Sequence, residues 1–400
     1  MSAAVPTRDD GGKPVIFLIA GEESGDLLGG GLMRELARRL TDVRFIGVGG
    51  ARMADAGLDS IFPIETIQLH GLSEVLVRLP DLWRKIRATA AAVVAADPDV
   101  LVVIDSPAFS LRVAKAVRRL NPRIPIVDYV SPSVWAWAPW RARGMRPFVD
   151  HLMAILPFEP DVHRRLGGPP TTYVGHPLTE RLDALRPRPG ERAPLGVGGS
   201  PVLLVLPGSR RSEVRRLMRS FGEAVKRVVD SAGPVEVVLP AVDALADDIR
   251  EAAAGWALPP AIVTGEEAKH VAFRRAHAAL AASGTVTLEL ALAGVPMVVA
   301  YRVDIFLRAM KPLLQARSIV LPNLIADENA VPELLDSAAT PENLAAALLP
   351  LLSESPERAR QLAAFDRVAA LMQQGEGTPS ARAADIVLAA MRRRRALGAV

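Results

Sequence analysis

Short runs of β-branched and aliphatic residues alternate with helix-like segments along the chain, and this alternation limits the fold more than any other feature. Apolar runs separated by helical crossovers are typical of βαβ units and a parallel sheet. In the first half we expect strands at Val15–Ala20, Arg44–Val48, Val100–Ile104, Ile126–Val130, His151–Leu156 and Thr172–Val174.

A segment rich in proline and glycine, 186–201, separates two such regions, and 400 residues exceed what one hydrophobic core usually serves. The sequence therefore predicts an α/β fold of two Rossmann-like, doubly wound domains. We expect an N-terminal domain at 1–185, a linker at 186–201 and a C-terminal domain at 202–400, whose last helix is free to pack back on the first domain. The second-half strands are expected at Val202–Leu206, Val235–Leu239, Ala261–Thr264, Ala278–Ala281 and Met297–Val299.

Composition excludes several classes of function. The chain has no cysteine, so disulfides and cysteine-ligated metals are excluded, and a reducing compartment fits best. The polar N-terminus lacks a signal-peptide core, and charges interrupt the apolar runs, so we expect a cytoplasmic protein without a membrane span. Aromatic residues make up only 4% of the chain and show no stacking pattern, which argues against nucleic acid as a partner.

Spacing in the first half predicts two helices around Pro80. Leu72, Val75, Leu76 and Leu79 recur at helical spacing, and Pro80 is expected to end this helix before a second one begins near Leu82. With the nearby Trp83, Arg84, Lys85 and Arg87, this amphipathic stretch is a candidate for membrane contact. A helix that packs on the core explains the same spacing equally well.

The clearest predicted anion site follows the strand Val202–Leu206. Gly208 lets the backbone approach a ligand, the amides of the next helix point at it, and Arg210 adds a fixed charge beside Ser209. An ordinary turn capped by Ser209 or Ser212 is the alternative.

A second loop of this kind, Ser283-Gly284-Thr285, follows the strand at Ala278–Ala281, and Glu289 one turn later is suited to accept hydrogen bonds from ribose hydroxyls. Ser283 acting only as a helix cap is the alternative here. Because both loops follow strands of one predicted parallel sheet, together they indicate a site for a nucleotide diphosphate.

We expect neither a metal nor a cofactor. The one D-x-D motif, Asp97-Pro98-Asp99, precedes a strand and therefore lies at the end of the sheet away from ligands, where a helix-to-strand turn is its simplest interpretation. A leaving diphosphate then depends on Arg210 and helix dipoles. In the first half, two tryptophans in the segment YVSPSVWAW follow a strand and are suited to flank a sugar ring or an acyl chain, although interior packing also explains them.

The motifs GEESGD, IDSPAF, YVSPSVWAW, LPFEP, GHP, LPGSRRSEV, ASGTVTLE and LPNLI occur in one order between about residues 14 and 385, and with them the chain resembles the lipid-A-disaccharide synthases. The resemblance implies a GT-B fold with a cleft between two Rossmann-like domains. It also implies inverting transfer from UDP-2,3-diacylglucosamine to 2,3-diacylglucosamine 1-phosphate (lipid X), with release of UDP, at the surface of the inner membrane. The oligomeric state is left open.

The resemblance also assigns site residues. It places Arg210 at the diphosphate, Ser283, Gly284 and Thr285 at the UDP, Glu289 at the ribose and Asn323 at the nucleotide end of the cleft. Ser24 in the acidic loop GEESGD is expected to face the donor sugar or its phosphates. Because the diphosphate belongs to the other domain, we expect this loop to bind sugar hydroxyls and to cap its own helix through Ser24 and Asp26.

Two positions depart from the family pattern. The family usually has a second acid in a D-x-P-D-F turn, whereas the turn here reads Asp105-Ser106-Pro107-Ala108-Phe109, and Ala138 stands where arginine is common. Alanine cannot accept the proton of the acceptor 6-hydroxyl, so Asp105 is the catalytic base expected here, or a carboxylate of the acidic loop replaces it. The alternatives are a slow or inactive paralogue that binds a sugar nucleotide or lipid, and a UDP-sugar 2-epimerase, which shares the two-domain plan.

Overall fold

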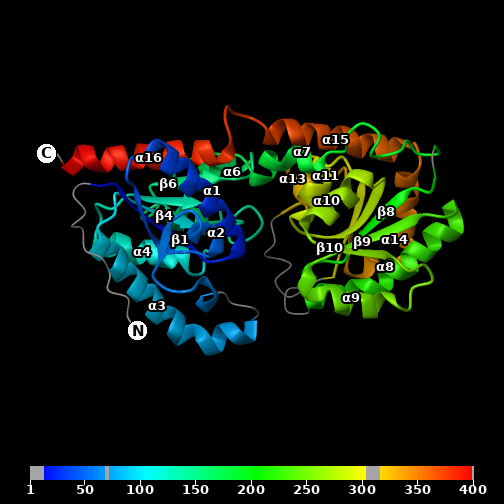
Figure 1. The fold of residues 1–400 in the computed structure, drawn as a ribbon, viewed down its shortest axis with the longest axis horizontal. Helices are drawn as coiled ribbons and strands as arrows, with labels where there is room; N and C mark the ends of the chain where they lie inside the picture. The colour runs from blue at the N-terminus through cyan, green and yellow to red at the C-terminus, as the bar shows by residue number, and fades with distance from the viewer. Residues whose placement is uncertain (1–12, 68–71, 198, 303–315, 399–400) are drawn as a thin grey trace. The chain divides into compact units, whose positions relative to one another are not determined.

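The computed structural model describes residues 13–67, 72–197, 199–302 and 316–398, without the side chains of residues 72–79 and 397–398. It divides into two compact units, each built on one parallel sheet (Figure 1). Residues up to Pro177 form the first unit together with the segment Gly375–Val400, and Leu178–Gln374 form the second. The last segment of the chain therefore belongs with the first unit, and residues 178–201 belong with the second.

The first unit contains a seven-stranded sheet in the order β3-β2-β1-β4-β5-β6-β7. All neighbouring strands are parallel. The strands are β1 (Val15–Ala20), β2 (Arg44–Val48), β3 (Leu58–Ser60), β4 (Val100–Ile104), β5 (Ile126–Tyr129), β6 (His151–Ala154) and β7 (Thr171–Tyr173).

Helices cover both faces of this sheet because its central strands are apolar on both sides. The helices α1 (Glu23–Arg39) and α16 (Pro379–Gly398) bury one face, where Leu32 packs with Val387 and Val102. The helices α3 (Leu72–Ala96) and α4 (Ser110–Leu120) bury the other, where Val93 and Val113 meet Leu101. Short helices, α2 (Ala51–Ala54), α5 (Trp140–Met145) and α6 (Glu159–Leu166), follow β2, β5 and β6.

The second unit contains a six-stranded parallel sheet in the order β10-β9-β8-β11-β12-β13. Its strands are β8 (Val202–Leu206), β9 (Glu236–Ala241), β10 (Ala261–Thr264), β11 (Ala278–Ala282), β12 (Met297–Tyr301) and β13 (Glu333–Leu335). Its helices include α7 (Leu182–Leu185), α8 (Arg211–Ala232), α9 (Ala246–Ala253), α10 (Glu266–Arg275), α11 (Val286–Leu292), α13 (Leu321–Ala326), α14 (Pro341–Leu348) and α15 (Pro356–Met372).

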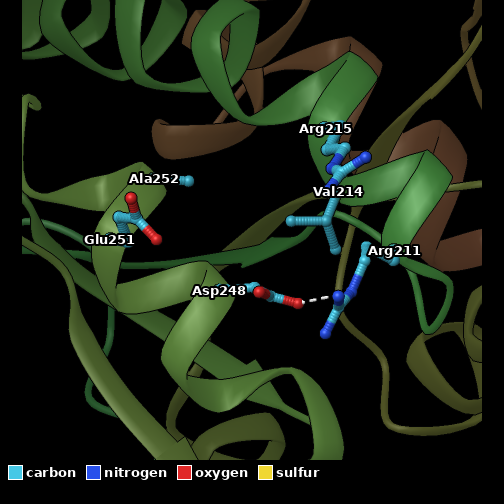
Figure 2. Close-up of a pocket in the computed structure, with 6 residues that line it drawn as sticks. All are labelled: Arg211, Val214, Arg215, Asp248, Glu251 and Ala252. Carbon is cyan, nitrogen blue, oxygen red and sulfur yellow. Dashed lines mark ion pairs between the residues drawn. The ribbon is translucent and has the colours of Figure 1, made fainter.

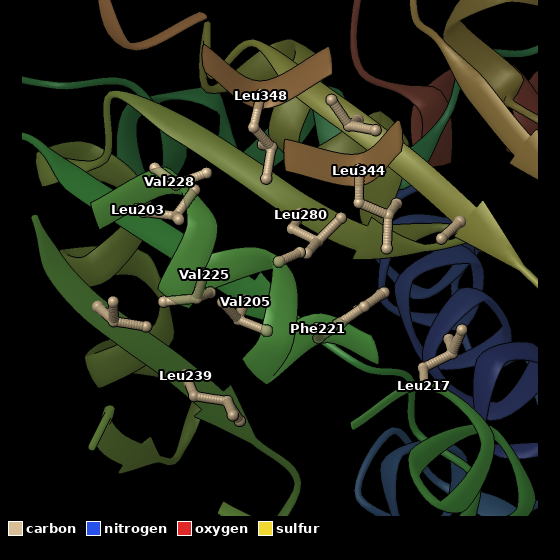
Figure 3. Packing of buried hydrophobic residues seen from close by; sticks show 14 of the residues in the cluster. Leu203, Val205, Leu217, Phe221, Val225, Val228, Leu239, Leu280, Leu344 and Leu348 are labelled. Carbon is tan, nitrogen blue, oxygen red and sulfur yellow. The ribbon is translucent and has the colours of Figure 1, made fainter. Parts of the chain in front are cut away.

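A dense aliphatic core fixes α8 on the second sheet. Figure 3 shows Leu217, Phe221 and Val225 of α8 and Leu344 of α14 among the residues of this cluster. Leu280 of β11 lies in the same cluster. This packing is what positions the start of α8 directly after β8.

The structure agrees with the expected strands within a few residues at their ends and corrects the prediction in two ways. β3 and β13, both three residues long, were not predicted. The helix expected to end at Pro80 instead runs without a break from Leu72 to Ala96, with Pro80 inside it. The side chains of Leu72, Val75, Leu76 and Leu79, on which the membrane interpretation rested, lie outside the described residues.

The segment 186–201, expected as a linker, is bound to the second unit by partly buried polar contacts. The Arg192 guanidinium donates to the carbonyls of Phe273 and Ala293 at 3.0 and 2.9 Å, and to those of Arg274 and Gly294. These carbonyls end α10 and α11, where the helix dipole favours a cation. His277 adds a contact between its Nε2 and the carbonyl of Ala193 at 2.8 Å.

The D-x-D motif lies at the amino end of the first sheet, where its carboxylates bind backbone and arginine. Asp99 accepts a hydrogen bond from the amide of Val15 at 2.9 Å and pairs with Arg395, while Asp97 pairs with Arg394 of α16. The helix-to-strand interpretation is confirmed, because Asp97 and Asp99 lie between the end of α3 and the start of β4. None of the described helices is long and apolar enough to cross a membrane.

Candidate active site

Both sheets reverse their strand order at one point, and this point predicts where ligands bind. In the first unit the chain leaves β1 toward β2 and returns on the other side at β4; in the second it leaves β8 toward β9 and returns at β11. Ligands of doubly wound sheets bind beyond the carboxyl ends of the strands at such a switch point. The expected site residues Ser24 and Asp105 follow β1 and β4, and Gly208 and Ser283 follow β8 and β11.

In the first unit the structure brings two expected site residues into contact. The hydroxyl of Ser24 donates a hydrogen bond to Oδ2 of Asp105 at 2.9 Å, although the two residues are 81 positions apart. The loops pack tightly below this pair, because a side chain at Gly21 would place its Cβ 2.4 Å from Cβ of Ser106. Glycine at position 21 is therefore required for the approach of β1's loop to that of β4.

The Asp105 loop is strained and pinned. Asp105 and Ser106 both adopt left-handed backbone conformations, at φ +53° and +48°. Oδ1 of Asp105 accepts from the amide of Ser106 at 2.8 Å, and the Ser110 hydroxyl donates to the Asp105 and Ser106 carbonyls. Consecutive left-handed residues other than glycine cost free energy and persist where the surroundings enforce them, which is common at functional sites. The turn thus aims Oδ2 of Asp105 at Ser24.

The two positions that depart from the family pattern lie in different environments. Ala108 is exposed in the turn between β4 and α4, so a larger side chain has room there. Ala138 is buried and left-handed, at φ +53°, just before α5. Arg141 of α5 stacks on the Trp137 ring at 5.3 Å, and burial lowers the pKa of its guanidinium.

The acidic segment is helix rather than loop, and the expected capping of its own helix is wrong. α1 begins at Glu23, the hydroxyl of Ser24 is directed to Asp105, and the buried carboxylate of Asp26 accepts from the amides of Gly50, Arg52 and Met53 at 2.7 to 3.1 Å. Asp26 therefore caps α2, the helix after β2. A carboxylate that accepts three backbone hydrogen bonds is a structural element of this loop cluster.

Two buried carboxyl groups of the first unit, those of Asp128 and Glu159, were not singled out from the sequence. Asp128, the third residue of β5, is 2% exposed, and its Oδ2 has no hydrogen-bond partner in the described part of the chain. Desolvation raises the pKa of Asp128 well above its ordinary value, and the charges of Asp105 and Glu159 add to this. Burial raises the pKa of Glu159 to about 7. The family motif LPFEP contained Glu159, but nothing in the motif marked it as buried.

In the second unit, the loop after β8 presents a glycine and an exposed arginine at the start of α8. Gly208 has φ +112°, and a Cβ there would lie 2.3 Å from Oε2 of Glu213. Arg210, the N-cap residue of α8, has a side chain that is 76% exposed and pairs with Oε1 of Glu213 at 3.0 Å. Glu213, which the sequence interpretation did not include, thus packs on Gly208 and orients the Arg210 guanidinium. The exposed Ser209 lies between them in the chain.

The loop after β11 lies beside the β8 loop because β8 and β11 are adjacent. Gly284 and Thr285 are exposed ahead of α11, and the Ser283 hydroxyl donates to the carbonyl of Ile319 at 2.9 Å. The buried Thr287 donates to the Gly284 carbonyl at 2.8 Å. The loop is therefore fixed from below while its backbone stays accessible to a ligand.

Two other expected ligand contacts have partners within the protein. Oε2 of Glu289 pairs with Nζ of Lys269 at 2.9 Å. The Asn323 side chain is buried: its amide donates to the Val331 carbonyl and to Glu333, and its oxygen accepts from the Val331 amide at 2.9 Å. A ligand that binds Glu289 therefore shares its carboxylate with Lys269. Asn323 joins α13 to the segment before β13.

A surface hollow of about 420 Å³ lies between α8 and α9 (Figure 2). Arg211 and Asp248 form an ion pair in it at 2.8 Å, while Arg215 and Glu251 line it. None of the expected site residues lines this hollow. Arg211 is thus paired with Asp248, whereas its neighbour Arg210 pairs with Glu213.

Comparison with known proteins shows the family to which this chain belongs. The sequence model of the family described as lipid-A-disaccharide synthetase matches residues 16–387. The chain belongs to this family. A lipid-A-disaccharide synthase of Nitrobacter hamburgensis is 55% identical over 380 residues, covering 94% of this chain and 95% of that protein. One of Rhodospirillum centenum is 45% identical and covers 94% of each chain.

Solved structures with low identity share the fold. MurG of Acinetobacter baumannii is 15% identical, with a TM-score of 0.59 and coverage of 94% of this chain and 99% of that one. A UDP-N-acetylglucosamine 2-epimerase of Neisseria meningitidis is 12% identical, with the same TM-score and coverage of 95% and 100%. These likenesses show a GT-B type fold of two Rossmann-like units. Membership of the lipid-A-disaccharide synthase family makes the chain a glycosyltransferase that forms the lipid A disaccharide.

Proposed function

We propose that the chain joins UDP-2,3-diacylglucosamine to lipid X with Asp105 as the base and Arg210 at the leaving diphosphate. The acceptor 6-hydroxyl oxygen forms a bond to C1 of the donor sugar as the bond from C1 to the phosphate oxygen breaks. The hydroxyl proton passes to Asp105, and UDP leaves with the electron pair. Attack from the face opposite the diphosphate inverts C1 and gives a β-1,6 linkage.

The hydrogen bond between Ser24 and Asp105 is the observation that carries this proposal. It holds one oxygen of an accessible carboxylate at the switch point of the first sheet, where a sugar hydroxyl is expected. A general base of this kind contributes about 10²- to 10⁴-fold to the rate. On this proposal Asp105 takes the role that the second acid of the turn has elsewhere in the family.

In the second unit, the proposal assigns the UDP to the β8 and β11 loops. Arg210 and the first amides of α8 offset the charge that develops on the diphosphate, and Gly208, Ser209, Ser283, Gly284 and Thr285 form its surroundings. Glu289 binds the ribose, and Asn323 lies at the nucleotide end of this site. These roles need no divalent ion, since the guanidinium and the helix dipole supply the positive charge.

An assay of disaccharide formation from the donor and lipid X tests the proposal. We expect Asp105→Asn to lower kcat by about 10²- to 10⁴-fold. Asparagine tolerates the left-handed conformation that Asp105 adopts, so this variant preserves the turn. Activity equal to wild type in Asp105→Asn contradicts the assignment of the base. Tight donor binding without any product in the wild type favours the paralogue that only binds, which the alanine at position 108 motivates.

We further propose that the chain acts at the inner-membrane surface. Trp83, Trp137 and Trp140 are exposed on the first unit, and Arg112 stacks over the Trp83 ring at 5.3 Å. Tryptophan and arginine are the residues that favour a boundary between lipid and water. Flotation with vesicles of anionic lipid at low salt tests this, with Trp83→Ala expected to reduce binding; equal recovery of the protein without vesicles contradicts it.

A further inference from the structure

The segment 131–137, which contains most of YVSPSVWAW, lies between two strained residues. Val130 has φ +84° and Ala138 has φ +53°. A β-branched residue in the left-handed region is a genuine outlier, and such a conformation persists only where surrounding contacts enforce it. The contacts that hold this segment in place are therefore candidates for a functional role.

Two buried side chains of α6 bind this segment. Oε1 of Glu159 accepts from the Trp135 indole Nε1 at 3.3 Å, and its Oε2 accepts from the Leu156 amide at 3.0 Å. Nε2 of His163 lies 2.7 Å from the hydroxyl of Ser131. Glu159 and His163 are four residues apart, so they project from one face of α6. Both are nearly inaccessible to solvent, at 2% and 0% exposed.

The hydrogen bonds determine which nitrogen of His163 carries the proton. The Ser131 hydroxyl donates its proton to the Pro132 carbonyl at 2.9 Å, so Nε2 of His163 is the donor to Ser131. Nδ1 then carries no proton, and it has no partner among the described residues. Burial lowers the pKa of His163 to about 4, which keeps the ring neutral. The contact is thus one fixed N–H···O hydrogen bond.

Apolar contacts complete the hold of α6 on the segment. The Trp135 ring packs edge to face on Phe158, with centroids 5.6 Å apart at 84°. Val134 is buried with Ala142 and Val162 in the same small cluster. Ser131, Val134 and Trp135 are therefore held by α6, the helix that follows β6, with Ala142 of α5 in the same cluster.

The strand that leads into this segment is also bonded to the proposed base. The amide of Asp105 donates to the Tyr129 carbonyl at 2.9 Å, one residue before Val130. A change in the path of the segment at Val130 is therefore transmitted to Asp105 through one peptide. Displacements of about 1 Å at a reacting group can cost roughly 10²-fold in rate.

We propose that Glu159 and His163 are positioning residues, which hold the segment 131–137 in the one conformation in which it flanks the acceptor sugar beside Asp105. The inference deepens the proposed function and rests on it, since it assigns the acceptor to the first unit. It predicts a defect specific to the acceptor. Contacts with UDP belong to the second unit and stay unchanged.

Steady-state kinetics of Glu159→Ala, His163→Ala and Glu159→Gln test the proposal, with Arg164→Ala as the matched control on the exposed face of α6. We expect Glu159→Ala and His163→Ala each to raise KM for lipid X about tenfold, while KM for the donor and the affinity for UDP stay unchanged. Glutamine retains an acceptor for Trp135 and is expected to rescue part of the loss. Arg164→Ala is expected to match wild type.

Lipid X binding followed by tryptophan emission separates this inference from the reaction itself. We expect Glu159→Ala to weaken binding and shift the emission, and the shift to vanish in a Trp135→Phe background. Weakened lipid X binding supports the inference even when the wild type forms no disaccharide, an outcome that rejects the proposed function alone. Unchanged lipid X affinity in folded Glu159→Ala and His163→Ala, or equal losses for lipid X and UDP, overturns it.

Discussion

The Ser24 hydroxyl, in the first turn of α1, and the Asp105 carboxylate, in the loop after β4, meet at 2.9 Å beyond the ends of two adjacent strands. The contact leaves Asp105 hydrogen-bonded on both oxygens, since Oδ1 accepts from the Ser106 amide. A carboxylate held in this way has one orientation toward a sugar hydroxyl. We therefore expect activity to depend on the orientation of the Asp105 carboxylate as well as on its presence.

Ser24→Ala removes this contact while it leaves the backbone of α1 intact. A hydrogen bond to a charged group contributes about 1.5–3 kcal/mol, so we expect kcat to fall roughly ten- to a hundredfold. UDP affinity, measured by titration calorimetry, should not change. Ser24→Thr keeps a hydroxyl and should retain most of the activity; wild-type kcat in Ser24→Ala would show that Asp105 needs no such support.

Ala108→Asp restores the acid that the family usually has in this turn. Because position 108 is exposed, the added carboxylate meets no buried neighbour. We expect kcat to rise by about tenfold or more, within the range of a general base. The double variant Asp105→Asn, Ala108→Asp should then keep activity that Asp105→Asn loses. A decrease in kcat for Ala108→Asp alone would mean that the turn has adapted to Asp105 as its only base.

Arg210 and Arg211 are adjacent arginines with different partners, and they provide a matched pair for UDP binding. Arg210 lies at the β8 loop with Glu213, and Arg211 is paired with Asp248. We expect Arg210→Ala to raise the Kd for UDP by roughly tenfold or more, since charge-assisted hydrogen bonds contribute about 1.5–3 kcal/mol. Arg211→Ala should leave Kd within a factor of three. Equal effects of the two substitutions would place the diphosphate elsewhere.

Burial of Glu159 makes folding stability depend on pH. The pKa of Glu159 is about 7 in the folded chain and 4.5 when unperturbed, so the folded chain retains a proton that the unfolded chain loses. This contribution to stability is complete below pH 4.5 and is lost as pH rises through 7. His163 and His176, whose pKa values burial lowers to about 4, act in the opposite direction, because their contribution is lost as pH falls from 6.5 toward 4.

The difference between wild type and Glu159→Gln isolates the carboxyl group. As pH rises from 4.5 to 7, wild type loses the contribution of Glu159, whereas Glu159→Gln has no such contribution to lose. We therefore expect the unfolding free energy of the variant to rise relative to that of wild type, by about 1.4 kcal/mol for each unit of pKa shift. Urea unfolding across this pH range measures it, and both histidines are present in each protein. Parallel curves for the two proteins would show that Glu159 is ionised in the folded chain throughout.

Arg192→Ala tests the attachment of the segment 186–201. Its guanidinium binds four carbonyls at the ends of α10 and α11, which the substitution leaves without that donor. We expect a loss of about 2–3 kcal/mol in unfolding free energy, with a smaller loss for Arg192→Lys, which keeps the charge but not the planar fork. Thermal unfolding measures both; unchanged melting would mean that the segment contributes nothing to stability.

The long, apolar strands were predictable because burial on both faces leaves a clear signal, as in Val100–Ile104. β3 and β13 were not predicted, because both are short edge strands without a clear pattern of buried residues. Asp59 and Ser60 are exposed, and all of Glu333–Leu335 is half-buried. The course of α3 through Pro80 was not predicted either, since tertiary packing at Ile86 and Val93 outweighs one missing hydrogen bond.

The sequence names residues for the candidate site, but it does not predict their contacts. Gly208 and Arg210 follow from local turn chemistry, and the resemblance supplied Ser24. The contact between Ser24 and Asp105, the capping of α2 by Asp26 and the burial of Glu159 depend on residues far apart in sequence. Single-sequence patterns report local preferences, and they carry no information on which distant side chain completes a hydrogen bond.

The last helix has a consequence for how the protein is made. Ala383, Ala384 and Val387 of α16 fill the core beside Leu32, and Arg394 and Arg395 bind Asp97 and Asp99. During synthesis, domains usually fold as units from the N-terminus. Here the face of the first sheet that α1 and α16 share is only partly covered until α16 has been synthesised. The second unit, Leu178–Gln374, is synthesised in full before α16. It can therefore complete its folding before the first unit does.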